Sequence, residues 1–388
     1  MAPSSRQLRA RGEPSEAELK ILQVITPSRF SGAERVCVEI AAELQLAGHE
    51  VEVATKRIPE LRTALAEHGV PSHQVPISGK LNLAAPFIIA RLARRIGADI
   101  IHTHLSTASF WAAFAGRMAG IPVVSHVHAL NSCRWYKRAT RVIAVANAVK
   151  DHLIANGVPA ERIDVVHNTV DIPEPVGSPE AAEIRAQLGV APGAPLIIVA
   201  AHLSRKKGHH VLLRALQLEL GRTPDLCCCC LGDGPEREVL RHEAERLGLD
   251  GAIRFLGFRP DAREIMRAAD IVALPSIRGE GLPLCLLEAA ALGKPIIASR
   301  LSGIPEIVLD GQTGYVVEPN CPEALAARLG ALVASRKTRE TMGAAAREHA
   351  CRSFGRETRV AAILEVYRKA LATSARAKEA STPTPQAR

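Results

Sequence analysis

Short apolar runs alternate with segments of helical periodicity along the first half of this chain. Six runs have the length and composition of buried strands, at 20–26, 50–55, 72–77, 99–104, 122–128 and 141–146. Apolar residues recur at helical spacing in the segments 33–47, 84–96, 106–118 and 147–157. Asn147 is a candidate cap for the last of these helices. The pattern predicts strands and helices in alternation.

The alternation restarts after a proline-rich segment at 173–179. Further strands are expected at 196–203, 225–231, 253–256, 270–274, 295–298 and 315–317, with helices between them and over most of 322–371. Continuous apolar strands alternating with helices indicate parallel sheets covered on both faces. We therefore expect an α/β fold with two Rossmann-like doubly wound domains that face each other across a cleft, where such sheets bind ligands.

The expected organisation has six parts. They are a disordered N-terminal segment (1–19), an N-terminal Rossmann-like domain (20–172), a linker (173–179), a C-terminal Rossmann-like domain (180–353), a C-terminal helix (354–372) and a disordered tail (373–388). Packing of the C-terminal helix back onto the first domain is one option.

The composition of the 388 residues is that of a globular protein, with 47% hydrophobic and 23% charged residues. Only 3% are aromatic, which argues against a stacking surface for single-stranded nucleic acid. The net charge of +9 is spread evenly, because Lys and Arg number 20 against 16 Asp and Glu over residues 1–175, and 29 against 24 over the rest. A basic surface explains this charge, while an anionic ligand or a membrane surface is the sharper alternative.

Cysteine usage and hydropathy point to the cytoplasm. The nine cysteines are odd in number, and four of them, 227–230, are consecutive in a predicted buried strand, where they would alternate between two covered faces. Free thiols in this number fit a reducing compartment. The first residues form no apolar signal segment, and no run of about 18 apolar residues predicts a membrane span.

The most informative stretch is 280–288, in which Glu280 and Glu288 are separated almost entirely by apolar residues. Pro283 suits the first turn of a helix, and Gly281 and Leu282 would lie where free amides favour an anion. Because burying a lone carboxylate costs several kcal/mol, two in one apolar stretch indicate a polar ligand. A surface helix with ordinary carboxylates is the alternative.

Other turns at the expected strand ends also suit a ligand. The segment 202–208, His-Leu-Ser-Arg-Lys-Lys-Gly, places three adjacent cations where a diphosphate could bind, although a solvated basic loop has the same composition. The segments 30–34 and 232–234 contain glycines that allow a tight turn and a close approach of the backbone to a ligand. The second lacks the spacing of a dinucleotide-binding fingerprint.

Four histidines form two HxH pairs, His102 with His104 and His126 with His128. They could form a tetrahedral zinc site if their strands are neighbours, but no carboxylate or cysteine completes a catalytic metal site. We favour one or two histidines facing the cleft, where imidazole hydrogen-bonds a substrate or manages a proton. We expect no metal.

These elements in this order resemble the retaining glycosyltransferases of the GT-B fold, family 4, also called glycosyltransferase group 1. The resemblance covers roughly residues 20–370. It rests on Ser31-Gly32-Ala33-Glu34, the 202–208 loop, Gly232-Asp233-Gly234, Gly303-Ile304-Pro305-Glu306 and above all the E-x7-E pair Glu280/Glu288 with the following 289–295 segment. The last of these is highly specific, whereas the others are individually weak.

The resemblance implies a donor site for a nucleotide-diphosphate sugar in the C-terminal domain and an acceptor side in the N-terminal domain. Glu280 would lie by the donor sugar with the cleft histidine His128, and Glu288 would hold the ribose. The remaining implied donor-binding residues are Gly32, His202, Arg205, Lys207, Gly234, Gly281 and Leu282. The cations and amides would stabilise the diphosphate leaving group, and a carboxylate the sugar, so no cofactor is required beyond the donor substrate.

Two positions depart from the family pattern. His202 stands where the family usually has Arg, which weakens one phosphate contact or makes it pH-dependent. The family's Asn-Gly-Val-Asp is Asn168-Thr169-Val170-Asp171 here, which alters the turn before the linker.

The expected activity is retaining transfer of a sugar from a nucleotide sugar to a glycan or lipid-linked acceptor, in cell-surface polysaccharide, lipopolysaccharide or glycolipid biosynthesis. A nucleotide-sugar epimerase or hydrolase of the same fold and a non-catalytic nucleotide-sugar-binding protein are the alternatives. A basic helix with Arg91, Arg94 and Arg95, together with the segment 135–138, could touch the inner face of a membrane, but solvated helix faces explain these residues equally well.

Overall fold

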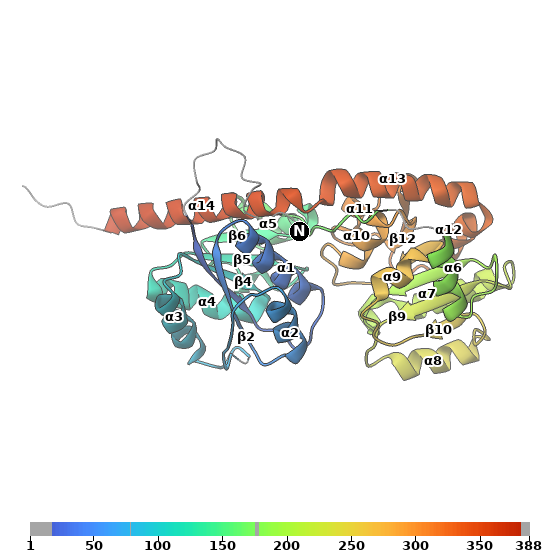
Figure 1. Cartoon of the computed structure of the whole chain (residues 1–388), viewed down its shortest axis with the longest axis horizontal. Helices are drawn as coiled ribbons and strands as arrows, with labels where there is room; N and C mark the ends of the chain where they lie inside the picture. Colours follow the sequence, from blue (N-terminus) through green and yellow to red (C-terminus); the bar gives the residue numbers. More distant parts are fainter. Residues whose placement is uncertain (1–17, 78, 175–177, 382–388) are drawn as a thin grey trace, which may run out of the picture.

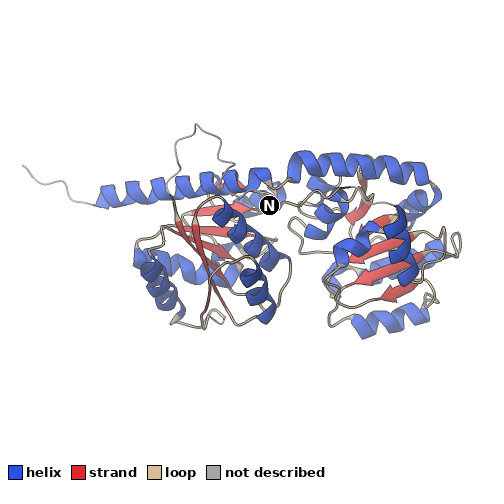
Figure 2. Cartoon of the chain, in the orientation of Figure 1, coloured by secondary structure: helices blue, strands red, loops and turns tan. Residues whose placement is uncertain are grey.

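The computed structural model describes residues 18–77, 79–174 and 178–381. Two α/β lobes lie side by side, and a long helical segment at the C-terminus runs along both of them (Figure 1). In each lobe the strands are enclosed by helices (Figure 2). Two parallel-sheet Rossmann-like domains therefore build the molecule, as the alternating pattern predicts.

The first sheet has seven strands in the order β3-β2-β1-β4-β5-β6-β7, and neighbouring strands run parallel. Its strands are β1 (Lys20–Ile25), β2 (Glu50–Thr55), β3 (Ser72–Gln74), β4 (Ile100–His104), β5 (Val123–Val127), β6 (Arg141–Ala144) and β7 (Ile163–Val165). Its helices are α1 (Gly32–Leu46), α2 (Pro59–Glu67), α3 (Ala85–Ile96), α4 (Ser106–Ala119) and α5 (Asn147–Ala155), with short 3-10 turns η1 (Cys133–Trp135) and η2 (Ala160–Arg162).

The second sheet has six parallel strands in the order β10-β9-β8-β11-β12-β13. They are β8 (Leu196–Ala200), β9 (Cys227–Leu231), β10 (Ile253–Phe255), β11 (Ile271–Leu274), β12 (Ile296–Ser299) and β13 (Gly314–Val317). The accompanying helices are α6 (Ser178–Gln187), η3 (Arg205–Lys207), α7 (His209–Leu220), α8 (Arg237–Arg246), α9 (Ala262–Arg267), α10 (Leu284–Ala291), α11 (Ile304–Ile307), α12 (Pro322–Ala334), α13 (Arg336–Phe354) and α14 (Glu357–Ser381).

Both faces of each sheet are buried, which explains the continuous apolar runs. In β1, Ile21 and Ile25 belong to the apolar cluster that includes α1 and α14, whereas Leu22 and Val24 pack with α3 and α4 on the other face. The four cysteines of β9 alternate in the same way between two clusters, so they serve as small apolar residues. All nine cysteines lie among the described residues, and each is free.

Helix α14 leaves the second domain and packs on the first. It contacts α1, β5 and β6, and the side chains of Ile363, Val366 and Tyr367 are buried in the first domain's apolar cluster. None of the helices in the described part of the chain combines the length and apolar character needed to cross a bilayer.

Several local expectations need correction. Helix α5 begins at Asn147 with Ala146 in the cap position, so Asn147 is not the cap. Pro283 occupies the N-cap of α10, one residue before the helix, rather than its first turn. Helix α14 continues to Ser381, so residues 373–381 are helical rather than disordered. Of the segment 1–19, residues 1–17 lie outside the described residues, as do 175–177 of the linker and 382–388 of the tail.

Candidate active site

Glu280 lies in the loop that leaves the carboxyl end of β11, beside the loop that leaves β8. The two strands are neighbours, so their carboxyl ends bring the segment 276–282 against η3. Glu280 Oε1 accepts hydrogen bonds from Lys207 Nζ at 2.6 Å and from Ser276 Oγ at 2.5 Å. The Glu280 side chain is only 6% exposed, and Lys207 17%. An ammonium group and a hydroxyl group thus fix this buried carboxylate in place.

The backbone after Glu280 touches the first domain. A Cβ on Gly281 would lie 2.0 Å from the carbonyl oxygen of His128, so only glycine fits this contact. Ala129 and Gly281 form an isolated antiparallel bridge, and Asn168 Nδ2 donates to the carbonyl of Leu282 at 2.9 Å. The structure therefore brings together His128, from the second HxH pair, and Gly281 and Leu282, from the 280–288 stretch, as the resemblance implies.

His128 is held from behind by another histidine. Its Nε2 lies 3.0 Å from His104 Nδ1, and His104 Nε2 lies 3.2 Å from the side chain of Gln23. Burial lowers the pKa of His128 to about 4, so this imidazole is neutral at neutral pH. A neutral ring suits hydrogen bonding to a ligand better than storage of a proton.

A zinc site built from the two HxH pairs requires neighbouring strands. The strands β4 and β5 are neighbours, and His104 pairs in register with His126. Potential ligand atoms of His102, His104 and His126 lie within 4.8 Å of one another. However, His102 Nδ1 already lies 2.7 Å from the hydroxyl of Tyr367, and no carboxylate or cysteine joins this group among the described residues. A divalent cation there would be fully buried without an anionic ligand, which is unfavourable.

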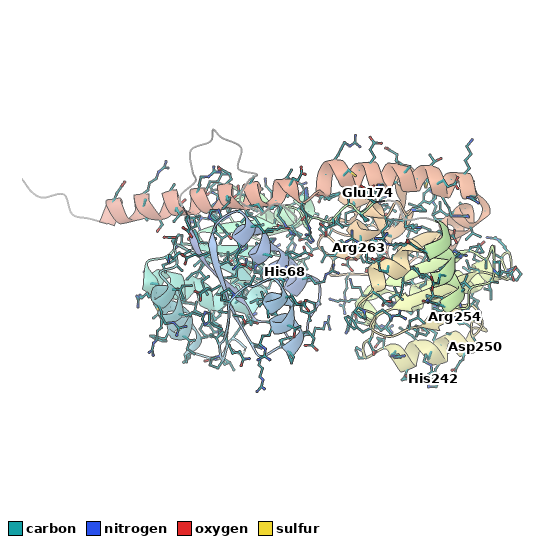
Figure 3. All side chains as sticks on the ribbon, in the orientation of Figure 1. His68, Glu174, His242, Asp250, Arg254 and Arg263 are labelled. Carbon is teal, nitrogen blue, oxygen red and sulfur yellow. The ribbon has the colours of Figure 1, made fainter. Side chains whose placement is uncertain are left out.

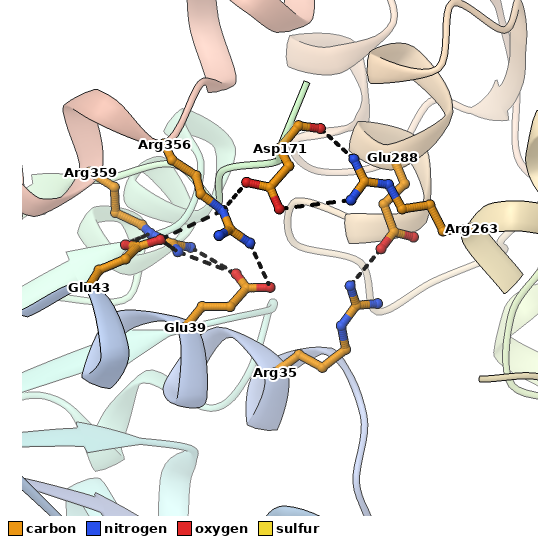
Figure 4. Close-up of polar contacts among 8 residues, drawn as sticks. All are labelled: Arg35, Glu39, Glu43, Asp171, Arg263, Glu288, Arg356 and Arg359. Carbon is orange, nitrogen blue, oxygen red and sulfur yellow. Dashed lines mark hydrogen bonds and ion pairs between the residues drawn. The ribbon is translucent and has the colours of Figure 1, made fainter. Parts of the chain in front are cut away.

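Glu288 lies near the other end of α10 and pairs across the domains. Its Oε1 accepts from Arg35 Nη2 of α1 at 2.6 Å, and its side chain is 10% exposed (Figure 4). A cavity of about 20 Å³ between α1 and α10 is lined by both residues. This volume holds about one water molecule, so the carboxylate expected to grip a ribose is occupied by Arg35 in this structure.

An ion-pair network that the sequence motifs do not predict surrounds this cavity. Arg359 of α14 is almost fully buried and pairs with Glu39 and Glu43, while Arg356 pairs with Asp171 at 2.7 Å (Figure 4). Arg263 lies on the side of the second domain that faces the first (Figure 3). It donates to the carbonyl of Asp171 at 2.6 Å (Figure 4). In the sequence, only the i,i+4 spacing of Glu39 and Glu43 points to this network, because two like charges on one helix face favour a cationic partner.

The basic loop after β8 is divided between several partners. His202 lies over the 232–234 turn, since a Cβ on Gly234 would lie 2.9 Å from His202 Cε1 and 2.3 Å from the carbonyl of Leu203. His202 Nε2 lies 3.0 Å from Arg29 Nη1 of the first domain. Arg205 is exposed, and its charge lowers the pKa of His210, after the larger effect of burial.

The turn after β1 reaches the same region. A Cβ on Gly32 would lie 3.6 Å from Leu284 Cδ1, so this turn packs against the start of α10. Glu34 accepts from the backbone N–H and hydroxyl of Ser31 at 2.9 and 2.6 Å, which makes it a cap of its own helix. Within this motif, Gly32 rather than Glu34 is therefore the residue that faces α10 of the second domain.

The motif 303–306 also has a structural role. Glu306 accepts from the N–H groups of Asn147 and Ala148 at 3.1 and 3.2 Å and from His167 Nε2 at 2.9 Å. A carboxylate of the second domain thus caps helix α5 of the first. Burial acts to raise the pKa of Glu306, but these hydrogen bonds outweigh it and hold the pKa below its usual range.

Two family models match this chain. Residues 180–349 match the family model described as glycosyl transferases group 1, and residues 30–174 match the model described as glycosyltransferase family 4.

Among curated proteins, the D-inositol 3-phosphate glycosyltransferase of Corynebacterium glutamicum is 35% identical over 222 residues, which are 55% of this chain and 53% of that protein. The protein of the same name from Streptomyces griseus is 32% identical over 325 residues, 70% of this chain and 67% of its own length. The matches to the corynebacterial relatives thus span about half the length of those proteins.

A solved structure of high similarity is HepE from Anabaena in complex with UDP. It is 27% identical, covers 90% of this chain and 100% of its own chain, and superposes with a TM-score of 0.81.

Proposed function

Because this chain belongs to the group 1 glycosyltransferases of the GT-B fold, we propose that it transfers a sugar from a nucleoside diphosphate sugar to an acceptor with retention of the anomeric configuration. The observation that carries the proposal is the buried Lys207–Glu280 pair, set against His128 and Gly281 where the two domains meet. Both domains contribute to this point, so a donor held by one domain could meet an acceptor held by the other.

The chemistry assigns different work to each side of the pair. Breaking a sugar–phosphate bond leaves negative charge on the diphosphate, which Lys207 and the amides at the start of α10 would stabilise. The sugar gains positive character, which the carboxylate of Glu280 would stabilise. Neutral His128 would hydrogen-bond the sugar from the opposite domain.

The UDP complex of HepE supports a UDP-linked sugar as the donor. The experiment is a panel of nucleotide sugars in a thermal-shift assay, followed by UDP-release measurements with the donor that stabilises the fold. Lys207→Met should lower turnover at least 100-fold by removing a leaving-group cation, on the order of what one such contact contributes. Lys337→Met, at an exposed site on α13, is the matched control. Equal turnover in both variants would contradict the assignment.

The alternatives are separated by omitting the acceptor. Release of UDP that continues at full rate without any acceptor would favour a hydrolase, and conversion of the donor sugar to an isomer would favour an epimerase. Binding of UDP without turnover across a broad acceptor panel would favour a non-catalytic protein. The intact Lys207–Glu280 pair favours catalysis.

The acceptor is proposed to be a glycan or lipid-linked molecule at the inner face of a membrane. The relatives named for D-inositol 3-phosphate and the basic, amphipathic α3 support a polar or anionic acceptor environment. Leu81, Leu83 and Phe87 are 94%, 76% and 63% exposed beside Arg91, a combination that suits an interfacial contact. Sedimentation with anionic liposomes at low salt tests it: recovery of wild type but not of Phe87→Ser in the pellet is expected. The free cysteines agree with a cytoplasmic location.

A further inference from the structure

Arg29 in the β1–α1 loop contacts the basic loop of the other domain. Its Nη1 lies 3.0 Å from His202 Nε2, although the residues are 173 positions apart. Arg29 is exposed, and no carboxylate pairs with it among the described residues. A guanidinium that reaches across the domain boundary to a neutral ring rather than to a carboxylate keeps its charge available for an anion.

His202 is neutral in this arrangement. Burial lowers its pKa first, and the charges of Arg29, Lys206 and Lys207 lower it further. Since Arg29 can only donate, Nε2 accepts and the ring proton lies on Nδ1, which is buried without a hydrogen-bond partner. The Nδ1–H group of His202 therefore has no hydrogen-bond acceptor among the described residues in this arrangement.

The surroundings of Arg29 carry excess positive charge. Lys206 lies close enough to Arg29 and Lys207 for both to lower its pKa, after the larger effect of burial. Glu280 offsets part of this charge and is already bonded to Lys207, while Asp233 lies near His202 and pairs with Arg237. The cations Arg29, Lys206 and Lys207 repel one another unless a further anion joins them.

We propose that Arg29 binds the diphosphate of the donor, so that the first domain adds a cation to a diphosphate site whose other cations belong to the second domain. The proposal rests on the proposed function and names one more donor-binding residue for it. The diphosphate would sit between Arg29 and the Lys206–Lys207 turn, with His202 orienting the guanidinium. Binding of a nucleoside diphosphate would then join the two domains.

The test is calorimetric titration of wild type and Arg29→Ala with UDP and with UMP. A charge-assisted contact to the second phosphate predicts that UDP binds Arg29→Ala about 10-fold more weakly, while UMP affinity changes less than about two-fold. The Kd for UDP should also depend less steeply on salt concentration in the variant. Arg62→Ala, at an exposed site on α2 of the same domain, should bind UDP as wild type does.

A second variant separates the lost charge from a disturbed loop. His202→Arg in the Arg29→Ala background places a guanidinium at the contacting position and should recover most of the UDP affinity. Unchanged UDP binding by Arg29→Ala, or an equal loss of UDP and UMP affinity, would overturn the role of Arg29 alone. If wild type binds neither UDP nor another nucleoside diphosphate, the proposed function falls with it.

Discussion

The two ends of the 280–288 segment are held in different ways. Glu280 takes both of its hydrogen bonds from its own domain, from Ser276 and Lys207, and is 6% exposed. Glu288 pairs with Arg35 of the other domain, 253 residues away, beside a water-sized cavity. The fold of one domain is sufficient to arrange Glu280, whereas the surroundings of Glu288 depend on how the two domains meet.

This difference indicates separate work for the two carboxylates. A carboxylate held by its own domain keeps its hydrogen bonds whichever way the other domain sits, which would suit the role proposed for Glu280 at the donor sugar. A carboxylate whose partner belongs to the other domain can exchange that partner for ligand hydroxyls when the nucleotide enters. Variants that act on one carboxylate and leave the other unchanged can separate the two roles.

Glu280→Gln should have the largest effect. Removing the charge while keeping the shape should lower kcat roughly 100- to 1,000-fold, with little change in UDP affinity, because the carboxylate would act on charge that develops during the reaction. The measurement is donor turnover together with UDP titration. A Glu280→Gln enzyme that loses UDP affinity as severely as turnover would show that this end binds the nucleotide.

The contact between α14 and α1 should dominate stability near the Glu288 end. Arg359→Met leaves the partly buried Glu39 and Glu43 with only the more distant guanidinium of Arg356, at 3.9 and 3.8 Å, which should lower the free energy of unfolding by about 3 kcal/mol. Arg356→Met, whose side chain is 42% exposed, should cost less than about 1 kcal/mol. Urea unfolding measures both. Equal losses would mean that burial does not set the strength of this network.

Arg35→Met should strengthen UDP binding, and this gain should be smaller than the losses expected above. The variant frees Glu288 from a half-exposed ion pair, so UDP should bind roughly 3- to 10-fold more tightly. Glu288→Gln should instead weaken UDP binding and reduce the discrimination between UDP and 2′-deoxy-UDP. Calorimetry decides; weaker UDP binding by Arg35→Met would mean that Arg35 contacts the nucleotide rather than competing with it.

The smallest expected effect concerns the cross-domain cap at Glu306. Its pKa is depressed in the folded protein, so its contribution is fully present above the pKa of the unfolded state and is lost as pH falls through the folded value. Glu306→Gln should therefore cost about 1 kcal/mol at pH 7 and less below about pH 4. Unfolding midpoints of both proteins across this pH range test the sign. A cost that grows toward low pH would contradict it.

Much of the fold follows from local patterns. Runs such as 20–25 and 227–231 are apolar at every or nearly every position, which only strands covered on both faces require. Helix α2 was missed because Leu61 and Leu65 are its only buried residues, and β7 because three residues at a sheet edge carry too little pattern. The end of α14 has no apolar periodicity that would mark it as helix.

Within the site, residues held by a single domain could be predicted from the sequence, whereas contacts between the two domains could not. The motifs around Glu280, Gly234 and Lys207 could be found because each sits directly after a strand, where parallel sheets gather their loops. The pairs Arg35–Glu288 and Arg29–His202 could not be found from the sequence, because residues so far apart meet only where the two domains dock. The sequence specifies each domain's turns locally, whereas the contacts between domains carry no local signal.

We expect Glu288 and Lys207 to hold two ends of one nucleotide while Glu280 faces its sugar. A crystal structure of the protein with UDP tests this most directly. We expect the ribose hydroxyls within hydrogen-bond distance of the Glu288 carboxylate, Arg35 displaced from it, and the diphosphate beside Lys207 and the start of α10. An intact Arg35–Glu288 pair with UDP bound elsewhere would contradict it.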